Sequence, residues 1–294
     1  MTQTFVAAEI ADQPASWRTA AAIVDSFEKQ LPAKGERVAV VGCGTSWFIA
    51  MSYAALREQA GHGETDAFAG SEFPAARKYD RVIAISRSGT TTEIVDLLSR
   101  LPGTTTTLVT AVPDSPAAGL ADHTIPLDFA DERSVVQTRF ATTVLALLRA
   151  QLGTDIEQVA RDAERAITVP IDQLLDADQV TFVGLGWAVG LANEAALKTR
   201  EAAQFWAEAY PAMDYRHGPI SIAQPGRLVW SLGPSPEGLR EDVAATGAQF
   251  VEFDLDPQAT LVIAQRFAVA LAEKRGLDPD NPRNLSRSVI LTAE

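Results

Sequence analysis

The stretch that decides the fold reads Arg37-Val38-Ala39-Val40-Val41-Gly42-Cys43-Gly44-Thr45-Ser46. Its four consecutive apolar residues are typical of a short strand that is buried on both faces of a parallel sheet. The two glycines end the strand, and the pattern from Trp47 to Gln59 predicts a helix after the loop. The stretch therefore predicts a strand, a hydroxyl-bearing loop and a helix, in that order.

A second unit of this kind follows along the chain. Arg81–Ile85 is predicted as a strand, residues 86–91 as a loop and Glu93–Leu101 as a helix, with Thr90 and Glu93 at the spacing of a capping box. The further expected elements are helices at Trp17–Leu31 and Phe140–Leu152 and strands at Thr106–Thr110 and Ile125–Leu127. Strands that alternate with helices predict an α/β fold with right-handed crossovers.

The chain then repeats its own pattern. Val180–Trp187 resembles Val38–Thr45 at an offset of 142 residues, and Arg227–Ser231 resembles Arg81–Ile85 at an offset of 146. Two near-equal offsets indicate a duplicated α/β unit. We expect a helical segment at 1–35, a first domain at 36–160 and a second domain at 161–294.

Composition limits the classes of partner. The 294 residues include 25 Lys and Arg against 38 Asp and Glu, for a net charge of −13, so nucleic acid and anionic membranes are not expected partners. The single cysteine excludes an internal disulfide, and no apolar stretch is long enough to span a bilayer. The first residues lack the features of a signal peptide, which makes the cytoplasm the expected compartment.

The hydroxyl-bearing loops point to an anion site. Ligands of open α/β sheets bind beyond the carboxyl ends of the strands, where helix N-termini accept phosphate. In the second half, Gly186-Trp187-Ala188 and Ser231-Leu232-Gly233-Pro234 stand where the first half has its hydroxyls. We therefore expect only the first half to keep a polar, anion-binding loop, although Thr90 alone is better explained as a helix cap.

Several other chemistries are disfavoured. Gly42-x-Gly44 lacks the third glycine of a dinucleotide fingerprint, because Trp47 occupies that position. Cys43 lies between glycines with no histidine nearby in sequence, which favours an inert, buried thiol. No two of the three histidines have the spacing of metal ligands, so we expect no metal and no cofactor.

The segment 190–220 suggests catalysis. A predicted helix at Leu191–Trp206 places Glu194, Lys198 and Glu201 on one stripe, and His217 follows in a sharp turn. The alternative is a solvated helix face with a Glu–Lys pair. A carboxylate can move a proton between adjacent carbons of an open-chain sugar, and a histidine can open the ring near neutral pH.

These segments resemble sugar isomerase (SIS) domain proteins. The motifs that carry the resemblance are residues 42–46, 86–91, Glu194 to Glu201, 207–210, His217-Gly218-Pro219 and the tail 278–286. The likeness covers nearly the whole chain and is greatest to the isomerase half of glucosamine-6-phosphate synthase and to stand-alone deaminases and deglycases. It implies two tandem SIS domains, each a parallel sheet flanked by helices in three αβα layers.

The resemblance also implies roles for individual residues. The expected phosphate ligands are Ser86, Arg87, Ser88 and Thr91. The expected sugar-binding residues are Gly44, Thr45, Ser46, Val135, Gln137 and Arg287. Glu201 matches the proton-shuttling glutamate, Lys198 its neighbour, and His217 the ring-opening histidine that the other subunit of a homodimer supplies.

The sequence also departs from the synthase. The SIS-like region begins almost at once, so a glutaminase domain is not expected, and Arg287 stands where the synthase has a lysine that can form an imine. Gln137 replaces a serine and Arg87 a glutamine. We expect an aldose–ketose isomerase that deaminates an amino-sugar 6-phosphate. A plain isomerase, a fructosamine-phosphate deglycase and a non-catalytic sugar-phosphate-binding regulator remain open alternatives.

Overall fold

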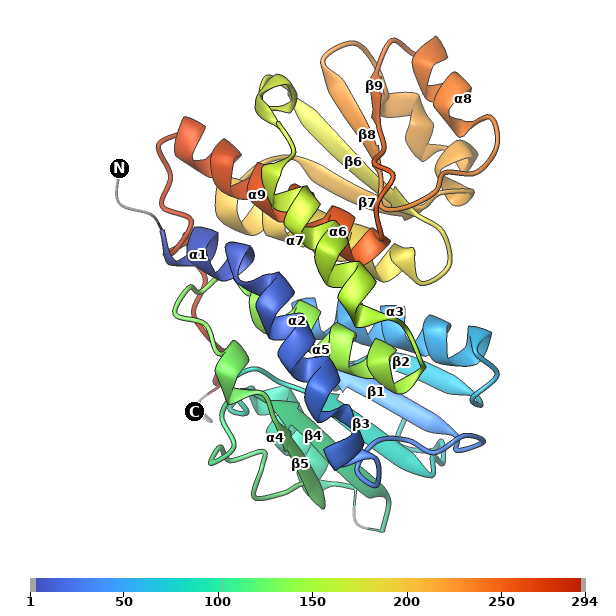
Figure 1. The fold of residues 1–294 in the computed structure, drawn as a ribbon, viewed down its shortest axis with the longest axis vertical. Coiled ribbons are helices and arrows are strands. Elements are labelled where there is room, and N and C mark those ends of the chain that lie inside the picture. The colour runs from blue at the N-terminus through green and yellow to red at the C-terminus, as the bar shows by residue number, and fades with distance from the viewer. Residues whose placement is uncertain (1–3, 102, 292–294) are drawn as a thin grey trace. The chain divides into compact units, whose positions relative to one another are not determined.

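The computed structural model describes residues 4–101 and 103–291, which divide into two compact units. We call them the five-stranded unit, from the described parts of residues 15–132, 139–156 and 286–294, and the four-stranded unit, from those of 1–14, 133–138 and 157–285. Figure 1 shows the strands of each sheet side by side. Each unit is a parallel sheet flanked by helices, so the predicted α/β fold with two such units is confirmed.

The five-stranded unit has the strand order β2-β1-β3-β4-β5, and every neighbouring pair is parallel. Its strands are β1 (Val38–Gly42), β2 (Thr65–Ala69), β3 (Arg81–Ile85), β4 (Thr105–Thr110) and β5 (His123–Pro126). Its helices are α3 (Thr45–Gln59), α4 (Thr92–Ser99), α5 (Arg139–Gln151) and most of α2 (Gln13–Ile23).

Alternate residues of these strands pack on opposite layers of helices. Ala39 and Val41 of β1, with Val82 and Ala84 of β3, belong to a core cluster that includes Leu97 and other apolar residues of α4. Because successive side chains of a strand point to opposite faces, Val40 and its neighbours face the other side, where α3 packs against β1, β2 and α5. Both faces are covered, which explains why the central strands are apolar throughout.

The four-stranded unit has the strand order β7-β6-β8-β9, again all parallel. Its strands are β6 (Gln179–Gly184), β7 (Ala207–Pro211), β8 (Arg227–Ser231) and β9 (Gln249–Val251). Its helices are α1 (Phe5–Ala11), most of α6 (Ile156–Thr168), α7 (Ala188–Ala203), α8 (Leu239–Ala245) and α9 (Pro257–Lys274).

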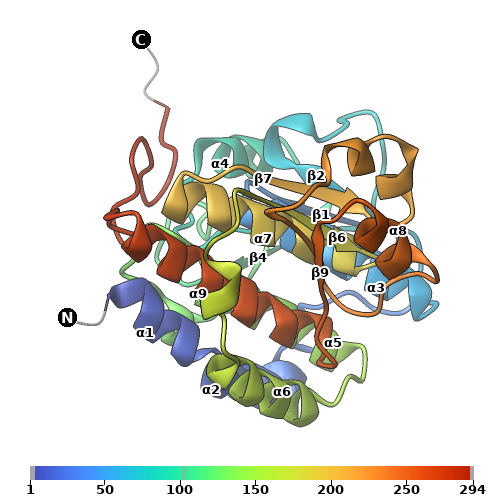
Figure 2. The ribbon, with the colours of Figure 1, turned by 90° about the horizontal axis from the view of Figure 1, so that it is seen from above.

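The helices of this unit also cover two faces. In Figure 2, α7 and α9 lie side by side, and Trp230 of β8 stacks edge-on against Phe267 of α9. On the opposite face, Val229 belongs to a cluster with Leu239 and Val243 of α8. The cluster also contains Tyr215, which belongs to the 3-10 helix Asp214–His217.

The two sheets share one plan, as the sequence repeat predicts. The order β7-β6-β8-β9 corresponds to β2-β1-β3-β4, and Val38 pairs with Thr65 just as Val180 pairs with Ala207, each at the offset of 142. Gly44 and Gly186 occupy the same place before the following helix, with φ values of 54° and 52°.

One predicted helix is wrong in length. Instead of continuing to Leu31, α2 ends at Ile23 and is followed by a 3-10 helix over Val24–Phe27. Two β-branched residues meet at this point, and short 3-10 turns are frequent at helix ends. Within residues 4–101 and 103–291, the helices are too short or too polar to cross a membrane.

The last residue of β1 and the last residue of β6 must be glycine. A Cβ on Gly42 would lie 2.5 Å from the Ser46 carbonyl carbon, and one on Gly184 would lie 2.3 Å from the Ala188 carbonyl oxygen. We expect Gly42→Ala and Gly184→Ala each to lower the free energy of unfolding by about 1–3 kcal/mol, because backbone has to shift. Chemical denaturation followed by circular dichroism measures the change.

The matched control for these variants is Gly119→Ala. A Cβ on Gly119 would meet its nearest atom at 3.6 Å, which is ordinary contact, and the variant should be neutral or slightly stabilising. Equal stability of Gly42→Ala and Gly119→Ala would contradict the close approach of helix and strand.

Candidate functional site

The loop after β3 is fixed at the carboxyl edge of the five-stranded sheet. The Ser86 N–H donates to the Val109 carbonyl at 3.1 Å, and the Ala111 N–H donates to the Arg87 carbonyl at 3.1 Å. Ser86, Arg87 and Ser88 are all buried. The end of β4 therefore holds the loop against the sheet, directly before the N-terminus of α4.

Hydroxyl groups organise the inside of this loop. Ser86 Oγ accepts the Gly89 N–H at 3.2 Å, and Ser88 Oγ accepts both the N–H of Thr90 at 3.2 Å and its hydroxyl at 2.9 Å. The predicted capping box is wrong, because Thr91 is the N-cap residue and makes no side-chain capping bond. The Thr90 hydroxyl is instead used within the loop, where it orients Ser88.

Gly89 lets the loop pass close to Ser115. Its φ is +63°, and a Cβ there would lie 1.9 Å from Ser115 Oγ. Ser115 is buried, and its hydroxyl has no hydrogen-bond partner among the described residues. The sequence analysis missed this serine, because 26 residues separate it from Gly89 and only the pairing of β3 with β4 brings the two together.

The loop after β1 provides two more hydroxyls. Thr45 and Ser46 are buried in the first turn of α3, and Gly44 turns the chain with its positive φ. Cys43 is half-buried, and burial raises the pKa of its thiol, although a hydrogen bond to the Gly70 backbone acts in the opposite direction. A protonated thiol is a weak nucleophile, which supports the predicted inertness of Cys43, whereas its burial is only partial.

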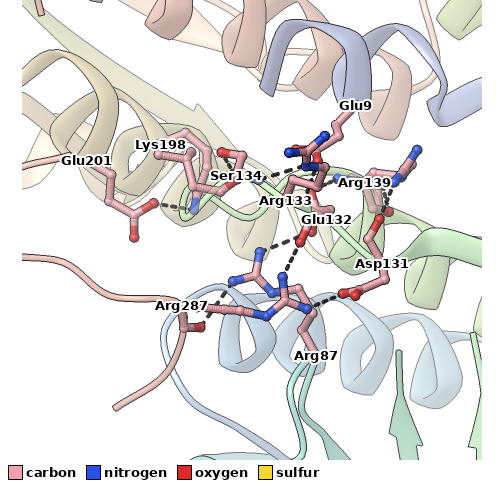
Figure 3. Close-up of polar contacts among 12 residues, drawn as sticks. Glu9, Arg87, Asp131, Glu132, Arg133, Ser134, Arg139, Lys198, Glu201 and Arg287 are labelled. Atoms are coloured by element: carbon pink, nitrogen blue, oxygen red, sulfur yellow. Dashed lines mark hydrogen bonds and ion pairs between the residues drawn. The ribbon is translucent and has the colours of Figure 1, made fainter. Parts of the chain in front are cut away.

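Arg87 and Arg287 contact acidic residues of one segment (Figure 3). Arg87 Nη1 lies 3.5 Å from Glu132 Oε2, with side-chain exposures of only 2% and 0%. Arg87 Nη2 donates to the Arg287 carbonyl at 3.1 Å, and Arg287 in turn donates to the Glu132 carbonyl and to the Asp131 carboxylate. Asp131 and Glu132 have no counterpart in the predicted site.

Helix α7 gathers three charged residues in the four-stranded unit. Lys198 Nζ lies 3.7 Å from Glu194 Oε1 and hydrogen-bonds to Glu201 Oε2, so the predicted stripe is a contiguous cluster. Figure 3 shows the Lys198 and Glu201 side chains pointing toward one another. The Lys198 and Glu194 side chains are 1% and 0% exposed, whereas Glu201 is 18% exposed and can reach a ligand. Lys198 thus orients Glu201, which is the one of the two carboxylates that solvent can reach.

The other predicted residues of this unit lie outside its α-helices and strands. His217 is exposed at the end of its 3-10 helix, directly before Gly218, whose φ is +140°. Val135 is half-buried, and its N–H donates to the Asp280 carbonyl at 3.3 Å. Glu9 of α1 holds the same segment, because its buried carboxylate accepts the Arg133 N–H at 2.6 Å.

The predicted site residues therefore form two groups, one in each unit. The five-stranded unit contains Gly44, Thr45, Ser46, Ser86, Arg87, Ser88, Thr91 and Arg287. The four-stranded unit contains Val135, Gln137, Lys198, Glu201 and His217. In the part of the chain that the structure describes, no group of three or more His, Cys, Asp or Glu side chains is arranged to hold a metal ion.

Part of the chain matches a known domain family, and the chain also resembles known proteins in sequence. The model of the SIS domain matches residues 32–151. The chain is 28% identical over 309 residues to a glutamine–fructose-6-phosphate aminotransferase (isomerizing) of Sulfolobus acidocaldarius, a match that covers 92% of this chain and 52% of that protein. The chain thus spans about half the length of the curated relatives it matches.

Two solved structures share the fold. Glucosamine-6-phosphate deaminase from Thermotoga maritima superposes with a TM-score of 0.81 at 23% identity, over 98% of this chain and all of that one. The C-terminal domain of glucosamine-fructose-6-phosphate aminotransferase from Francisella tularensis gives 0.79 at 21% identity, over 95% and 98%. Residues 32–151 therefore match a SIS domain, and the fold of the chain is similar to that of this deaminase and of the C-terminal domain of the aminotransferase.

Proposed function

We propose that the protein is a phosphosugar isomerase that deaminates an amino-sugar 6-phosphate. The observation that carries the proposal is the Lys198–Glu201 pair on α7, where a buried ammonium orients a carboxylate that solvent can still reach. A pure binding module has no need of a positioned proton carrier. A deaminase is similar in fold and an isomerizing aminotransferase is similar in sequence, and both support the same class of chemistry.

The loop 86–91 binds the phosphate in this proposal. Its serine hydroxyls, together with Thr91 at the N-terminus of α4, offer donors to an anion although the chain carries a net charge of −13. A phosphate far from the reacting carbons supplies binding energy that positions the sugar. Thr45 and Ser46 at the N-terminus of α3 bind the sugar hydroxyls.

The chemistry is a proton transfer followed by hydrolysis. His217 protonates the ring oxygen and opens the sugar to its aldehyde form. Glu201 takes the proton from C2, and its carboxyl group, which can exchange that proton with solvent, delivers a proton to C1. This converts the amino aldehyde into a C2 imine that bears a C1 hydroxyl. Water adds to the imine and ammonia leaves, so that the products are the ketose 6-phosphate and ammonia. Lys198 keeps the Glu201 carboxylate oriented toward the two carbons.

Replacing Glu201 tests the proton carrier. We expect Glu201→Gln to lower kcat by about 10²- to 10⁴-fold, because an amide cannot accept the C2 proton. The assay measures ammonia and fructose 6-phosphate formed from glucosamine 6-phosphate. Glu157→Gln, which changes an exposed carboxylate on α6, is the matched control and should retain full activity. Turnover of Glu201→Gln near that of the wild type would remove Glu201 from the mechanism.

Replacing the loop serines tests the anion site. A ligand that binds only the folded state raises the melting temperature, so glucosamine 6-phosphate should stabilise the protein and glucosamine should not. We expect the double variant Ser86→Ala, Ser88→Ala to lose this shift. Ser99→Ala at the end of α4 is the control, because its exposed hydroxyl donates to the Asp96 carbonyl of its own helix. An unchanged shift in the double variant would place the phosphate elsewhere.

Mixing inactive variants tests the proposed dimer with shared sites. If His217 acts on the partner's substrate, refolding equal amounts of Glu201→Gln and His217→Ala together creates one intact site per mixed dimer. Activity should then return to roughly a quarter of the wild-type value for a two-fold dimer. The control mixture of Glu201→Gln with Lys198→Met should stay inactive, because both residues belong to one helix. No recovery in the first mixture would contradict the shared site.

A further inference from the structure

We propose that Arg87 does not bind the phosphate but is a positioning residue that holds the C-terminal tail, residues 286–291, on the loop. The inference deepens the proposed function, because it divides the residues of one loop between two tasks. Ser86 and Ser88 serve the anion, whereas Arg87 serves the tail through its buried ion pair with Glu132.

The first argument is the charge balance of the loop. Arg87 is the only cation among residues 86–91, and its guanidinium already faces the fully buried Glu132 carboxylate. A phosphate that took over this guanidinium would leave a buried carboxylate without its counter-charge, which is strongly unfavourable. The anion is therefore better served by hydroxyl and N–H donors.

The second argument is that Glu132 cannot readily turn away. Its Oε1 accepts the N–H of Arg139, the first residue of α5, at 2.7 Å. A carboxylate at this position also suits the positive end of the helix dipole. Glu132 is therefore anchored to α5 on one side, and it presents its other oxygen to Arg87.

The third argument is that the same groups hold the tail (Figure 3). Arg87 Nη2 donates to the Arg287 carbonyl at 3.1 Å, and the Arg287 side chain donates to the Glu132 carbonyl and the Asp131 carboxylate. Arg87, Glu132 and Arg287 thus form a closed triangle of contacts. The Arg287 guanidinium also contacts the Asp131 carboxylate, which lies outside this triangle, and neutralises its charge.

The tail then runs along the loop. The Thr90 and Ser288 hydroxyls are hydrogen-bonded to each other at 3.0 Å, and the Thr92 N–H donates to the Val289 carbonyl at 3.2 Å. The Leu291 N–H donates to Thr92 Oγ1 at 2.8 Å. All of these contacts lie downstream of Arg287, so the triangle is the first of the contacts that attach the tail.

Limited trypsin digestion measures the attachment directly, because cleavage after Arg287 requires the tail to leave the loop. Mass spectrometry follows release of the peptide that begins at Ser288. We expect Arg87→Gln and Glu132→Gln each to speed this cleavage by about tenfold or more, since proteolysis tracks the open population. Arg87→Lys keeps the positive charge but lacks the two-pronged set of guanidinium donors. Its cleavage rate should therefore lie between those of the wild type and Arg87→Gln. Arg100→Gln, an exposed arginine at the end of α4, is the control and should not change the rate.

The cleavage rate of the double variant Arg87→Gln, Glu132→Gln distinguishes loss of this one contact from a general destabilisation of the fold. Because both residues act through one contact, its cleavage rate should equal that of the faster single variant rather than the product of the two effects. Multiplied effects would overturn the triangle.

Binding of inorganic phosphate, measured by calorimetry, separates the two tasks. Arg87→Gln should keep its phosphate affinity within about threefold of the wild type, whereas Ser86→Ala, Ser88→Ala should lose binding and keep the tail protected. Loss of phosphate affinity in Arg87→Gln, with or without tail release, overturns the proposal, as does an unchanged cleavage rate. Trypsin cleavage and phosphate binding are both measured without a catalytic reaction. If the wild type had no activity, that result would therefore count against the proposed function and not against this proposal.

Discussion

The structure depends on a close approach between strand and helix that occurs once in each unit. At Gly42 and at Gly184 the following helix passes so near the end of the strand that a single methyl group would overlap its backbone. This approach brings the first turns of α3 and α7 directly to the carboxyl edge of their sheets. A helix N-terminus and a short loop are therefore presented at the edge where α/β proteins bind ligands.

The two units share this backbone plan but carry different side chains. In the five-stranded unit, hydroxyls of the loops after β1 and β3 remain at the edge of the sheet. In the four-stranded unit, Trp187 and Ala188 stand where the five-stranded unit has Thr45 and Ser46. The Ser231 hydroxyl of the four-stranded unit donates to the Gly233 carbonyl at 2.8 Å inside its own turn. That unit instead has the Glu194–Lys198–Glu201 cluster on α7. In the proposed function, the loop of the five-stranded unit binds the phosphate and the cluster of the four-stranded unit moves the proton.

The central strands could be predicted from the sequence because they are buried on both faces. Runs such as Val38–Val41 and Arg81–Ile85 consist largely of consecutive apolar residues, which predicts a buried strand. The offsets of 142 and 146 residues between similar segments indicate the repeat. The edge strands β2 and β7 were missed, because Asp66 and Glu208 interrupt their apolar character. The helix α6 was also missed, although Val159, Ala160 and Ala163 recur on one buried face.

The charged stripe on α7 could likewise be predicted, since helical spacing alone places Glu194, Lys198 and Glu201 together. The partner of Arg87 could not be predicted, because Glu132 is 45 residues away in sequence. Only the packing of the five-stranded unit brings Glu132 to Arg87. The family resemblance implied a phosphate-binding role for Arg87 from its position in the loop motif alone. Its buried carboxylate partner is a tertiary feature, and it changes the inferred role of the arginine.

The central claim is that the protein moves a proton between carbons of a phosphorylated sugar, and hydrogen exchange into the substrate tests it most directly. Hexose and hexosamine 6-phosphates are incubated with the protein in D2O, and proton NMR follows the signals at C1 and C2. The account predicts deuterium at one of these carbons for a phosphorylated sugar and none for its unphosphorylated parent. Tight binding of a sugar phosphate with no carbon-bound exchange in any of them would contradict the account and indicate a binding protein.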